Sequence, residues 1–205
     1  MRTLYANFKG GTGKSTVVFN LALWQQANGV RVQVCDLDPQ RTVTDVAAIR
    51  TEDQIDPGLD VVNTLPARQK KNVEYLIDVG TSDMDAMRAA LRVADKVVIP
   101  VTPSQADIWA TQRFLEILRE ERPIGKLPPV TAFLNRADPH PRSRENAEAL
   151  EALGMLPGVT PVKEKLVQRL AFRRSFSEGL SVSELEPRGK AAAELDALAR
   201  VVCAS

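Results

Sequence analysis

Residues 9–16 carry side chains whose types and spacing suit phosphate chemistry. They read Lys-Gly-Gly-Thr-Gly-Lys-Ser-Thr, after an apolar run at residues 3–6 and before a helix-patterned stretch at residues 17–27. Glycines let backbone N–H groups turn toward a polyphosphate, and a helix N-terminus adds partial positive charge. Lys14 can reach the β- and γ-phosphates, and the Ser15 hydroxyl can bind Mg²⁺. We therefore predict that a nucleoside triphosphate is bound by Lys9, Gly10, Gly11, Thr12, Gly13, Lys14, Ser15 and Thr16.

The loop departs from the strict G-x-x-x-x-G-K-[ST] pattern, because Phe8 stands at the first glycine and a second lysine, Lys9, stands at the mouth. In this form it resembles the deviant Walker A motif of the ParA/MinD family of ATPases. Lys14 already serves the phosphates within one chain, so a second cation is most useful from a facing subunit. The resemblance implies that Lys9 crosses an ATP-dependent homodimer. We expect both lysines to be catalytic.

Two carboxylates follow the next apolar run, in Asp36-Leu37-Asp38-Pro39-Gln40. Side chains two residues apart on an extended segment point the same way, so both can face a metal ion or a water. The segment resembles the family's switch I motif, which implies that Asp38 positions or activates the attacking water and that Asp36 supports the metal shell. Read without that context, Asp38-Pro39 is a turn.

Asp78 ends the apolar run Tyr75-Leu76-Ile77, as the aspartate of a Walker B strand does. Such a carboxylate usually holds Mg²⁺. We therefore predict a Mg²⁺ site at Ser15, Asp36 and Asp78. The residues after Asp78 differ from the family's usual pattern. The residue that senses the γ-phosphate is therefore not identified, and the Gly80 backbone N–H is the best candidate.

Two later segments resemble family features. Residues 100–107, Pro-Val-Thr-Pro-Ser-Gln-Ala-Asp, resemble a loop at the dimer interface of small partition ATPases, although Ser104 also suits a helix cap. Trp109 is expected in the core. In relatives an asparagine at the place of Asn135 reads the adenine edge. The preference for ATP rests on that resemblance, since residues 135–138 superficially resemble a guanine signature.

The C-terminal part is locally basic, with Lys163, Lys165, Arg169, Arg173 and Arg174 against one acid, Glu164. The plain interpretation is a solvated helix face. Residues 179–190 resemble the end of ParA proteins, in which basic residues of this region contact DNA phosphates without reading sequence. We therefore expect Arg169, Arg173 and Arg174 to contact nonspecific DNA.

The composition of the chain limits the classes of protein to which it can belong. The chain has 205 residues, 44% hydrophobic and 26% charged, with a net charge of +1, which excludes a uniformly basic nucleic-acid coat. Cys35 and Cys203 are expected to be unpaired, and His140 is expected in an exposed loop. No apolar run approaches the ~18 residues of a membrane span. We expect a cytoplasmic, nucleoid-associated protein that is one ATPase domain over residues 1–205, resembling the short ParA form.

The elements that must position these residues alternate along the chain. The patterns predict strands at 3–8, 30–35, 59–63, 75–79, 96–101 and 130–134, a short one near Val159, and helices at 16–27, 43–50, 83–94, 106–122, 142–153, 164–178 and 189–202. Strands that are apolar on both faces and separated by helices indicate an α/β fold: a mostly parallel, twisted sheet with helices on both faces. In such sheets ligands bind beyond the carboxyl ends of the strands.

The resemblance implies a switch that dimerises on ATP, binds nonspecific DNA and positions or segregates cargo. A ParB-like or adaptor protein would stimulate hydrolysis and release monomers. Two alternatives stay open. A MinD-like membrane switch needs a terminal helix with basic residues opposite bulky apolar ones, whereas residues 191–205 are alanine-rich. A ligase or synthase like dethiobiotin synthetase would use the same loop, but it would need a small acid substrate.

Overall fold

The computed structural model describes residues 1–204. The strands are β1 Arg2–Tyr5, β2 Arg31–Asp36, β3 Val61–Val62, β4 Val73–Asp78, β5 Lys96–Val101, β6 Val130–Ala137 and β7 Val159–Val167. The helices are α1 Lys14–Ala27, α2 Thr42–Glu52, α3 Met84–Val93, α4 Gln105–Glu121, α5 Arg144–Gly154, α6 Leu170–Ser177, α7 Val182–Leu185 and α8 Lys190–Val202.

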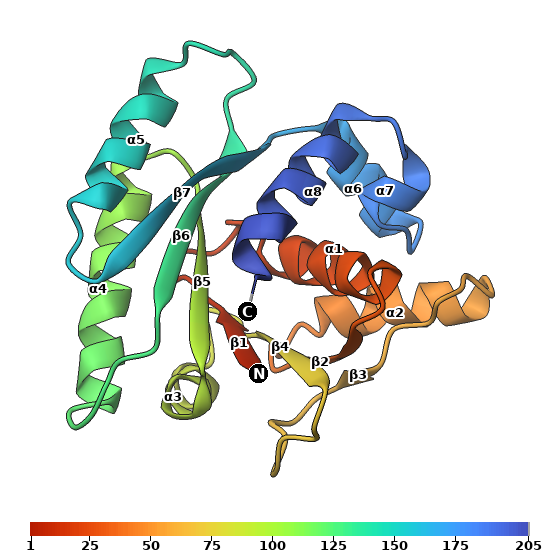
Figure 1. Ribbon diagram of the computed structural model, residues 1–205, viewed down its shortest axis with the longest axis horizontal. Helices are drawn as coiled ribbons and strands as arrows, with labels where there is room; N and C mark the ends of the chain where they lie inside the picture. The colour runs from red at the N-terminus through yellow and green to blue at the C-terminus, as the bar shows by residue number, and fades with distance from the viewer. Residues whose placement is uncertain (205) are drawn as a thin grey trace.

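The described strands form a seven-stranded sheet in the order β3-β2-β4-β1-β5-β6-β7, and each neighbouring pair is parallel (Figure 1). The order runs in both directions from β1, which pairs with β4 on one side and β5 on the other. This reversal opens a crevice at the carboxyl end of β1, directly before the glycine loop. The predicted α/β fold class is confirmed.

Two apolar cores lie on opposite faces of the sheet. On one face, α3, α4 and α5 cover a core that includes Met87, Phe114 and Leu153. On the other, α1, α2, α6 and α8 cover a core that includes Phe19, Phe133 and Leu198 (Figure 1). Because both faces are covered, β1 and β5 are buried along almost their whole length, as their continuous apolar sequences require.

The predicted helix over residues 164–178 is wrong in its first half. Residues 159–167 form β7, so Lys163 and Lys165 lie on a strand, and α6 begins only at Leu170. The run of charged residues suggested a helix, but β7 pairs with β6 as far as Val167 and its backbone groups are bonded there. Tertiary pairing overrode the local charge pattern.

The expectation for Trp109 is also wrong, because its side chain is 57% exposed. It lies on α4 beside the exposed Gln112 and Arg113, and the core side of that helix is filled by Ile108, Phe114 and Leu115.

The expectations for the cysteines and His140 are confirmed: both thiols are free and His140 is exposed. No helix in the described part of the chain has the length and apolarity that a membrane span needs.

Candidate nucleotide-binding site

The glycine loop joins β1 to α1 and leaves the start of that helix open. Gly11 and Gly13 have φ values of 78° and 82°, a backbone region that favours glycine. A Cβ on Gly13 would lie 2.6 Å from the Asn135 Nδ2, so a larger residue cannot stand there without displacing Asn135. No side chain caps α1, and its first turn contains no acidic residue. The positive end of the helix dipole therefore faces the loop unopposed.

A cavity of about 290 Å³ lies over this loop. Seven of the predicted site residues line it: Gly10, Gly11, Gly13, Lys14, Ser15, Thr16 and Asp38. Thr12 is buried beneath the loop, and its hydroxyl oxygen has no hydrogen-bond partner in the described structure. Gln40, Thr42, Thr81 and Ser82 also line the cavity, although sequence reasoning missed them. Their position directly after β2 and β4 was the signal that could have found them.

Asp38 lies against the segment that follows β4. Its carboxylate accepts a hydrogen bond from the Gln40 backbone N–H at 2.9 Å. A Cβ on Gly80 would approach the Asp38 carboxylate oxygens to 2.7 and 2.8 Å, so only glycine allows this close packing. The glycine proposed to sense the γ-phosphate and the carboxylate proposed to position the water are therefore in contact.

Asp78 and Lys14 are both buried, and each influences the pKa of the other. Both carboxylate oxygens of Asp78 are buried without a hydrogen-bond partner, and burial raises the pKa of Asp78 to about 7, against opposing effects of Ser15 and Lys14. Burial also lowers the pKa of Lys14, while Asp78 and Asp38 oppose that shift. Two buried, unpartnered carboxylate oxygens beside the Ser15 hydroxyl fit a hard divalent cation. They meet the requirement for a Mg²⁺ site.

Asp36 is held by protein groups instead. Its Oδ2 accepts hydrogen bonds from the Thr44 backbone N–H at 2.9 Å and the Thr44 hydroxyl at 2.8 Å. Its Oδ1 accepts a weaker one, 3.3 Å long, from the Asp38 N–H. Asp36 thus ties the segment containing Asp38 to α2, and its part in the metal site stays a prediction. Among the described residues no cluster of three His, Cys, Asp or Glu forms a protein-only metal site. Mg²⁺ commonly binds through one or two carboxylates and substrate phosphates.

The Lys9 side chain points toward α4 and away from the cavity that Lys14 lines. Its Nζ donates to the Asp107 Oδ2 at 2.7 Å, and the Lys9 side chain stays 45% exposed while that of Asp107 is 1% exposed. Ser104 caps α4 by accepting a hydrogen bond from the Asp107 N–H, so the predicted cap is confirmed. The Lys9 backbone N–H donates to Asn7, whose side chain in turn donates to the Pro100 carbonyl. The loop at residues 100–107 is thus joined to the start of the glycine loop.

A bulge in β6 aims two consecutive side chains at the glycine loop. Arg136 has a φ of 54°, and the pairing of β6 with β7 shifts register on both sides of Asn135. Consecutive strand residues normally point to opposite faces, and the bulge removes that alternation. Asn135 donates from Nδ2 to the Thr12 carbonyl, and Arg136 donates from Nη1 to the Gly11 carbonyl, both at 2.6 Å. Sequence reasoning found Asn135 but missed Arg136.

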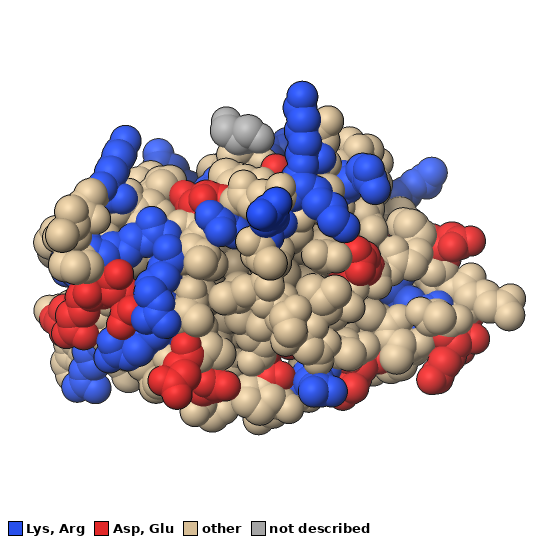
Figure 2. All heavy atoms as spheres, turned by 90° about the horizontal axis from the view of Figure 1, so that it is seen from below, with Lys and Arg blue, Asp and Glu red and all other residues tan. Residues whose placement is uncertain are grey.

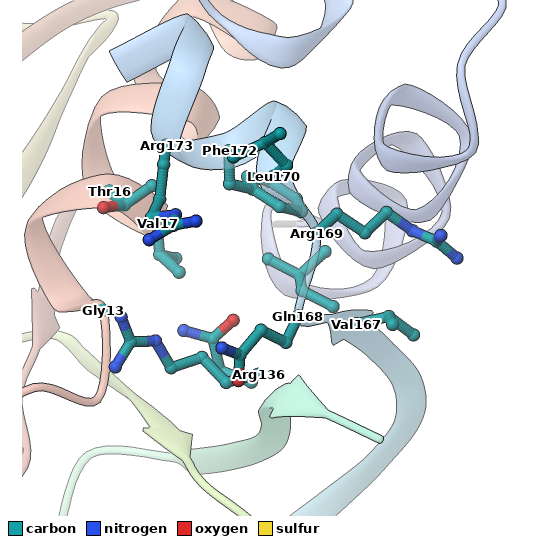
Figure 3. A pocket seen from close by; sticks show the side chains of 12 residues that line it. Gly13, Thr16, Val17, Arg136, Val167, Gln168, Arg169, Leu170, Phe172 and Arg173 are labelled. Carbon is teal, nitrogen blue, oxygen red and sulfur yellow. The ribbon is translucent and has the colours of Figure 1, made fainter. Parts of the chain in front are cut away.

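A second cavity, of about 260 Å³, continues from the first. The two share Gly13 and Thr16, and the second is otherwise lined by Val17, Asn135, Arg136, Leu166, Val167, Gln168, Arg169, Leu170, Phe172 and Arg173 (Figure 3). The first cavity is lined by Lys14, Ser15 and Asp38, which suit a triphosphate end, so the second is placed for the nucleoside end. Asn135 lines it, in agreement with the predicted base contact, which stays a prediction.

The three arginines expected to contact DNA lie in different environments. Arg169 forms a two-pronged ion pair with Glu194 of α8. Arg173 and Arg174 are both exposed; Arg173 turns toward the second cavity (Figure 3), and Arg174 approaches Glu178 at 4.0 Å. Figure 2 shows Lys and Arg interspersed with Asp and Glu around a largely uncharged centre on the face that it presents. On this face Lys and Arg form no continuous basic surface (Figure 2).

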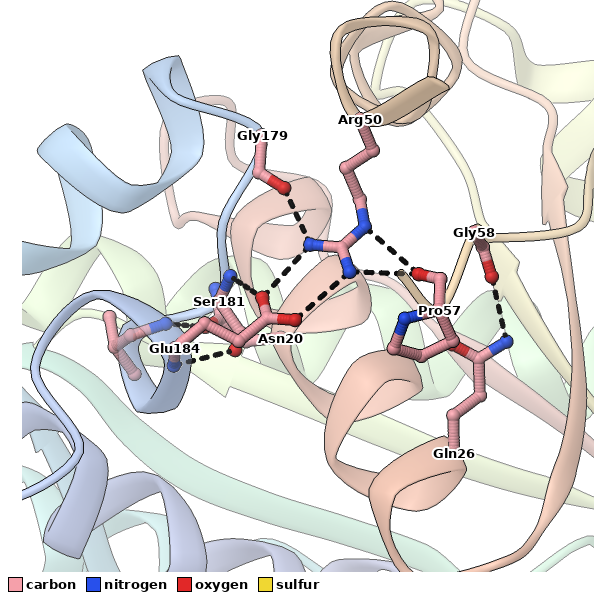
Figure 4. Close-up of polar contacts among 9 residues, drawn as sticks. Asn20, Gln26, Arg50, Pro57, Gly58, Gly179, Ser181 and Glu184 are labelled. Atoms are coloured by element: carbon pink, nitrogen blue, oxygen red, sulfur yellow. Dashed lines mark hydrogen bonds and ion pairs between the residues drawn. The ribbon is translucent and has the colours of Figure 1, made fainter. Parts of the chain in front are cut away.

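Arg50 joins α2 to the C-terminal segment. Its fully buried guanidinium donates to Glu184 at 2.9 Å through both terminal nitrogens, to the Gly179 carbonyl at 2.7 Å and to the Pro57 carbonyl at 2.8 Å (Figure 4). Because α2 follows Asp38 directly, these bonds connect the segment beside the phosphate cavity to the α6–α7 connection. Sequence reasoning missed this residue, and nothing in the sequence signals a buried arginine at this place.

Comparison with known proteins places this geometry among nucleotide-binding domains. Residues 3–182 match the profile of the CobQ/CobB/MinD/ParA nucleotide binding domain. The chain is 30% identical over 199 residues to the maintenance of carboxysome distribution protein A of Halothiobacillus neapolitanus, covering 92% of this chain and 89% of the relative. It is 27% identical to protein ParA of Rhizobium radiobacter over 199 residues, covering 93% and 89%.

Solved structures share the fold. A plasmid partition protein from Borrelia burgdorferi bound to AMPPNP superposes with a TM-score of 0.75 at 18% identity, covering 95% of each chain. MinD from Pyrococcus horikoshii complexed with Mg-ADP gives a TM-score of 0.74 at 17% identity, covering 98% of this chain and 95% of that one. At these identities the similarity concerns the fold alone.

Proposed function

Because the chain belongs to the CobQ/CobB/MinD/ParA nucleotide-binding family, we propose that it is a ParA-type ATPase that binds ATP with Mg²⁺, dimerises, and positions or segregates cargo on nonspecific DNA. One observation carries the proposal: the glycine loop holds two lysines that point to different places. Lys14 is buried and lines the phosphate cavity, while Lys9 is half exposed and pairs with Asp107 of α4. One cation serves the bound nucleotide, and the other can reach a second subunit once it leaves Asp107.

Nucleotide binding follows from the loop and its charges. The N–H groups of residues 10–16, the open start of α1 and the Lys14 ammonium together compensate a triphosphate in a cavity of about 290 Å³. Ser15 and Asp78 would hold Mg²⁺, with Asp36 in support. When bound, Mg²⁺ neutralises charge on the β- and γ-phosphate oxygens.

Hydrolysis requires a water placed in line with the γ-phosphate. Asp38 lies at the edge of the phosphate cavity and packs on Gly80. Its carboxylate accepts a proton or a hydrogen bond from that water, and Gly80 fixes its position. In the dimer, the Lys9 ammonium of each subunit stabilises the charge that develops on the nucleotide of the other, as an arginine finger does. Turnover by the isolated chain is then slow.

DNA binding is assigned to the basic C-terminal region. The sequence predicts Arg169, Arg173 and Arg174 as contacts, and Arg174 is the one of the three that faces outward without lining the second cavity. Two weak patches held on one dimer bind DNA far more tightly than either patch alone, so DNA binding depends on ATP. Relatives carry the names of carboxysome distribution and ParA proteins, and the solved neighbours include a plasmid partition protein. A protein assembly or a DNA molecule is therefore the expected cargo, with an adaptor that stimulates hydrolysis.

The two alternatives are less well supported. A membrane-binding helix needs a free apolar face, but the apolar side chains of α8, including Leu195, Leu198 and Val202, are buried against the core. A ligase or synthase like dethiobiotin synthetase is not favoured, because the relatives that match most of the chain are positioning proteins.

The experiment is DNA binding measured with ATP, with ADP and without nucleotide, on two DNA duplexes of unrelated sequence. We expect the protein to bind both duplexes with ATP but not with ADP or without nucleotide. Light scattering should show that the mass of the protein doubles when ATP is present. The Lys14→Ala protein is the control, and it should neither bind DNA nor dimerise at any ATP concentration. DNA binding of equal strength without nucleotide would contradict the proposed switch.

A further inference from the structure

Arg173 stands out among the basic residues of the C-terminal region. It lies on α6, and its exposed side chain extends toward Thr16 and Val17 of α1 (Figure 3). Within residues 1–204 its guanidinium has no hydrogen bond and no ion pair. By contrast, Arg169 and Arg174 on either side both approach carboxylates, those of Glu194 and Glu178.

The second cavity has a strongly one-sided charge. Arg136 enters it from β6 beside Gly13, and Arg173 enters it from α6 beside Thr16 and Val17 (Figure 3). No Asp or Glu stands among the described residues that line it. The Arg169 side chain points out of the cavity toward α8, where Glu194 neutralises it. Two guanidinium groups without a carboxylate, next to the open start of a helix, favour an anion between them.

The order of residues along the two cavities indicates which anion this is. The first cavity contains Lys14, Ser15 and Asp38, which suit the β- and γ-phosphates. The second begins at Gly13 and Thr16 and becomes apolar at Val17, Leu166 and Phe172. A nucleotide that spans both cavities has its α-phosphate at their junction and its base in the apolar part. The Arg173 guanidinium faces that junction.

The position of Arg173 is fixed by contacts between α6–α7 and α1. Phe176 of α6 packs edge-on against Phe19 of α1, with ring centroids 5.4 Å apart. The Val182 N–H donates to the Asn20 side chain at 2.9 Å. Since α1 begins with Lys14, the same helix carries one end of the phosphate site and holds the helix that presents Arg173. The helix that carries Arg173 is therefore held in place relative to the loop.

We propose that Arg173 is a nucleotide-binding residue that contacts the α-phosphate, rather than part of the DNA surface. The inference rests on the proposed function only in taking a nucleotide as the ligand. It assigns neighbouring arginines of α6 to different partners: Arg173 faces the nucleotide and Arg174 faces outward.

The test compares Arg173→Ala, Arg173→Lys and the matched control Arg174→Ala in binding to ADP and to adenosine with Mg²⁺, measured by calorimetry without DNA. Loss of charge-assisted hydrogen bonds to phosphate predicts that Arg173→Ala weakens ADP about 10- to 100-fold, with an intermediate loss for Arg173→Lys. Adenosine affinity should stay within about twofold, because adenosine has no phosphate. Arg174→Ala should bind ADP as the wild type does.

Three results would overturn the inference. One is ADP affinity of Arg173→Ala within about twofold of the wild type while DNA affinity falls, which would return Arg173 to the DNA surface. Another is an equal loss for ADP and adenosine, which would place the guanidinium on the base. The third is a wild-type chain that binds no ADP, which would refute the nucleotide site itself. Failure of ATP-dependent DNA binding alone would refute the proposed switch and leave Arg173 at the nucleotide, so the two failures are distinguishable.

Discussion

Lys9 and Asp107 face each other across the mouth of the glycine loop, with 2.7 Å between the lysine Nζ and the aspartate Oδ2. Asp107 is almost wholly buried in the first turn of α4, and its other carboxylate oxygen has no partner in the described structure. The lysine proposed to act on a second subunit is thus held within its own chain. It must leave Asp107 before it can reach a neighbouring nucleotide.

Substitutions of the two lysines of the loop are expected to have different effects. Lys14→Ala removes a buried cation from the phosphate cavity and should abolish nucleotide binding. Lys9→Ala should leave ATP binding measurable but remove ATP-dependent dimerisation and hydrolysis. Calorimetry and light scattering on both variants separate these effects. A Lys9→Ala protein that dimerises and hydrolyses ATP normally would refute the role in trans.

Release of Lys9 from Asp107 should favour the dimer. Asp107→Asn keeps the shape of the side chain but removes the charge that holds Lys9. Because the lysine is half exposed, its ion pair contributes about 0.5–1 kcal/mol, which corresponds to roughly a two- to fivefold lower ATP concentration at half-dimerisation. Sedimentation across an ATP titration measures this midpoint. An unchanged midpoint would show that the ion pair does not oppose dimerisation.

Asp38 is expected to affect hydrolysis but not binding. Asp38→Ala should bind ATP, dimerise and remain dimeric, with single-turnover hydrolysis slowed at least about 100-fold. Asp38→Asn is the matched variant, because an amide oxygen can still accept the hydrogen bond from the Gln40 N–H while the basic carboxylate is lost. If both variants hydrolyse ATP at the wild-type rate, the role belongs elsewhere, and Asp36 is the next candidate.

The ion pair between Arg50 and Glu184 should make stability depend on pH. Burial raises the pKa of Glu184, but hydrogen bonds from Arg50 and Ser181 outweigh it and hold the pKa below its ordinary value. A lowered carboxyl pKa stabilises the fold above the unfolded-state pKa, about 4.5, and this contribution is lost as pH falls through the lower folded-state pKa. Glu184→Gln, which leaves a buried guanidinium unpaired, should lower the free energy of unfolding by about 3 kcal/mol at pH 7.

Urea denaturation of the wild type and Glu184→Gln at several pH values checks this expectation. The difference between them should shrink as the pH falls below about 4. Glu178→Gln is the control, because Glu178 is exposed and only approaches Arg174, and its effect should stay below about 0.5 kcal/mol at pH 7. A difference for Glu184→Gln that persists unchanged at low pH would contradict an electrostatic origin.

Much of the site was predictable because it is local in the chain. Residues 9–16 form one loop between a strand and a helix, and Asp38 and Asp78 each stand just beyond or at the end of an apolar strand. Parallel strands bring their carboxyl ends to one edge of the sheet, so spacing and order sufficed to gather these residues. The prediction of a helix over residues 164–178 was wrong because the structure there depends on distant residues. Strand pairing with β6 depends on residues about thirty positions away, and no local pattern reports it.

The sequence by itself determined the alternation of strands and helices, the phosphate loop with its two lysines, and the carboxylates that follow β2 and end β4, because each depends on a short run of the chain. Only the tertiary structure decided what the long polar side chains contact. The fold placed Lys9 on Asp107, Arg136 on the glycine loop, Arg173 at the second cavity and Arg50 between α2 and the C-terminal segment. Flexible cations can reach many partners, and only the packed backbone selects which carboxylate, carbonyl or cavity lies within their reach.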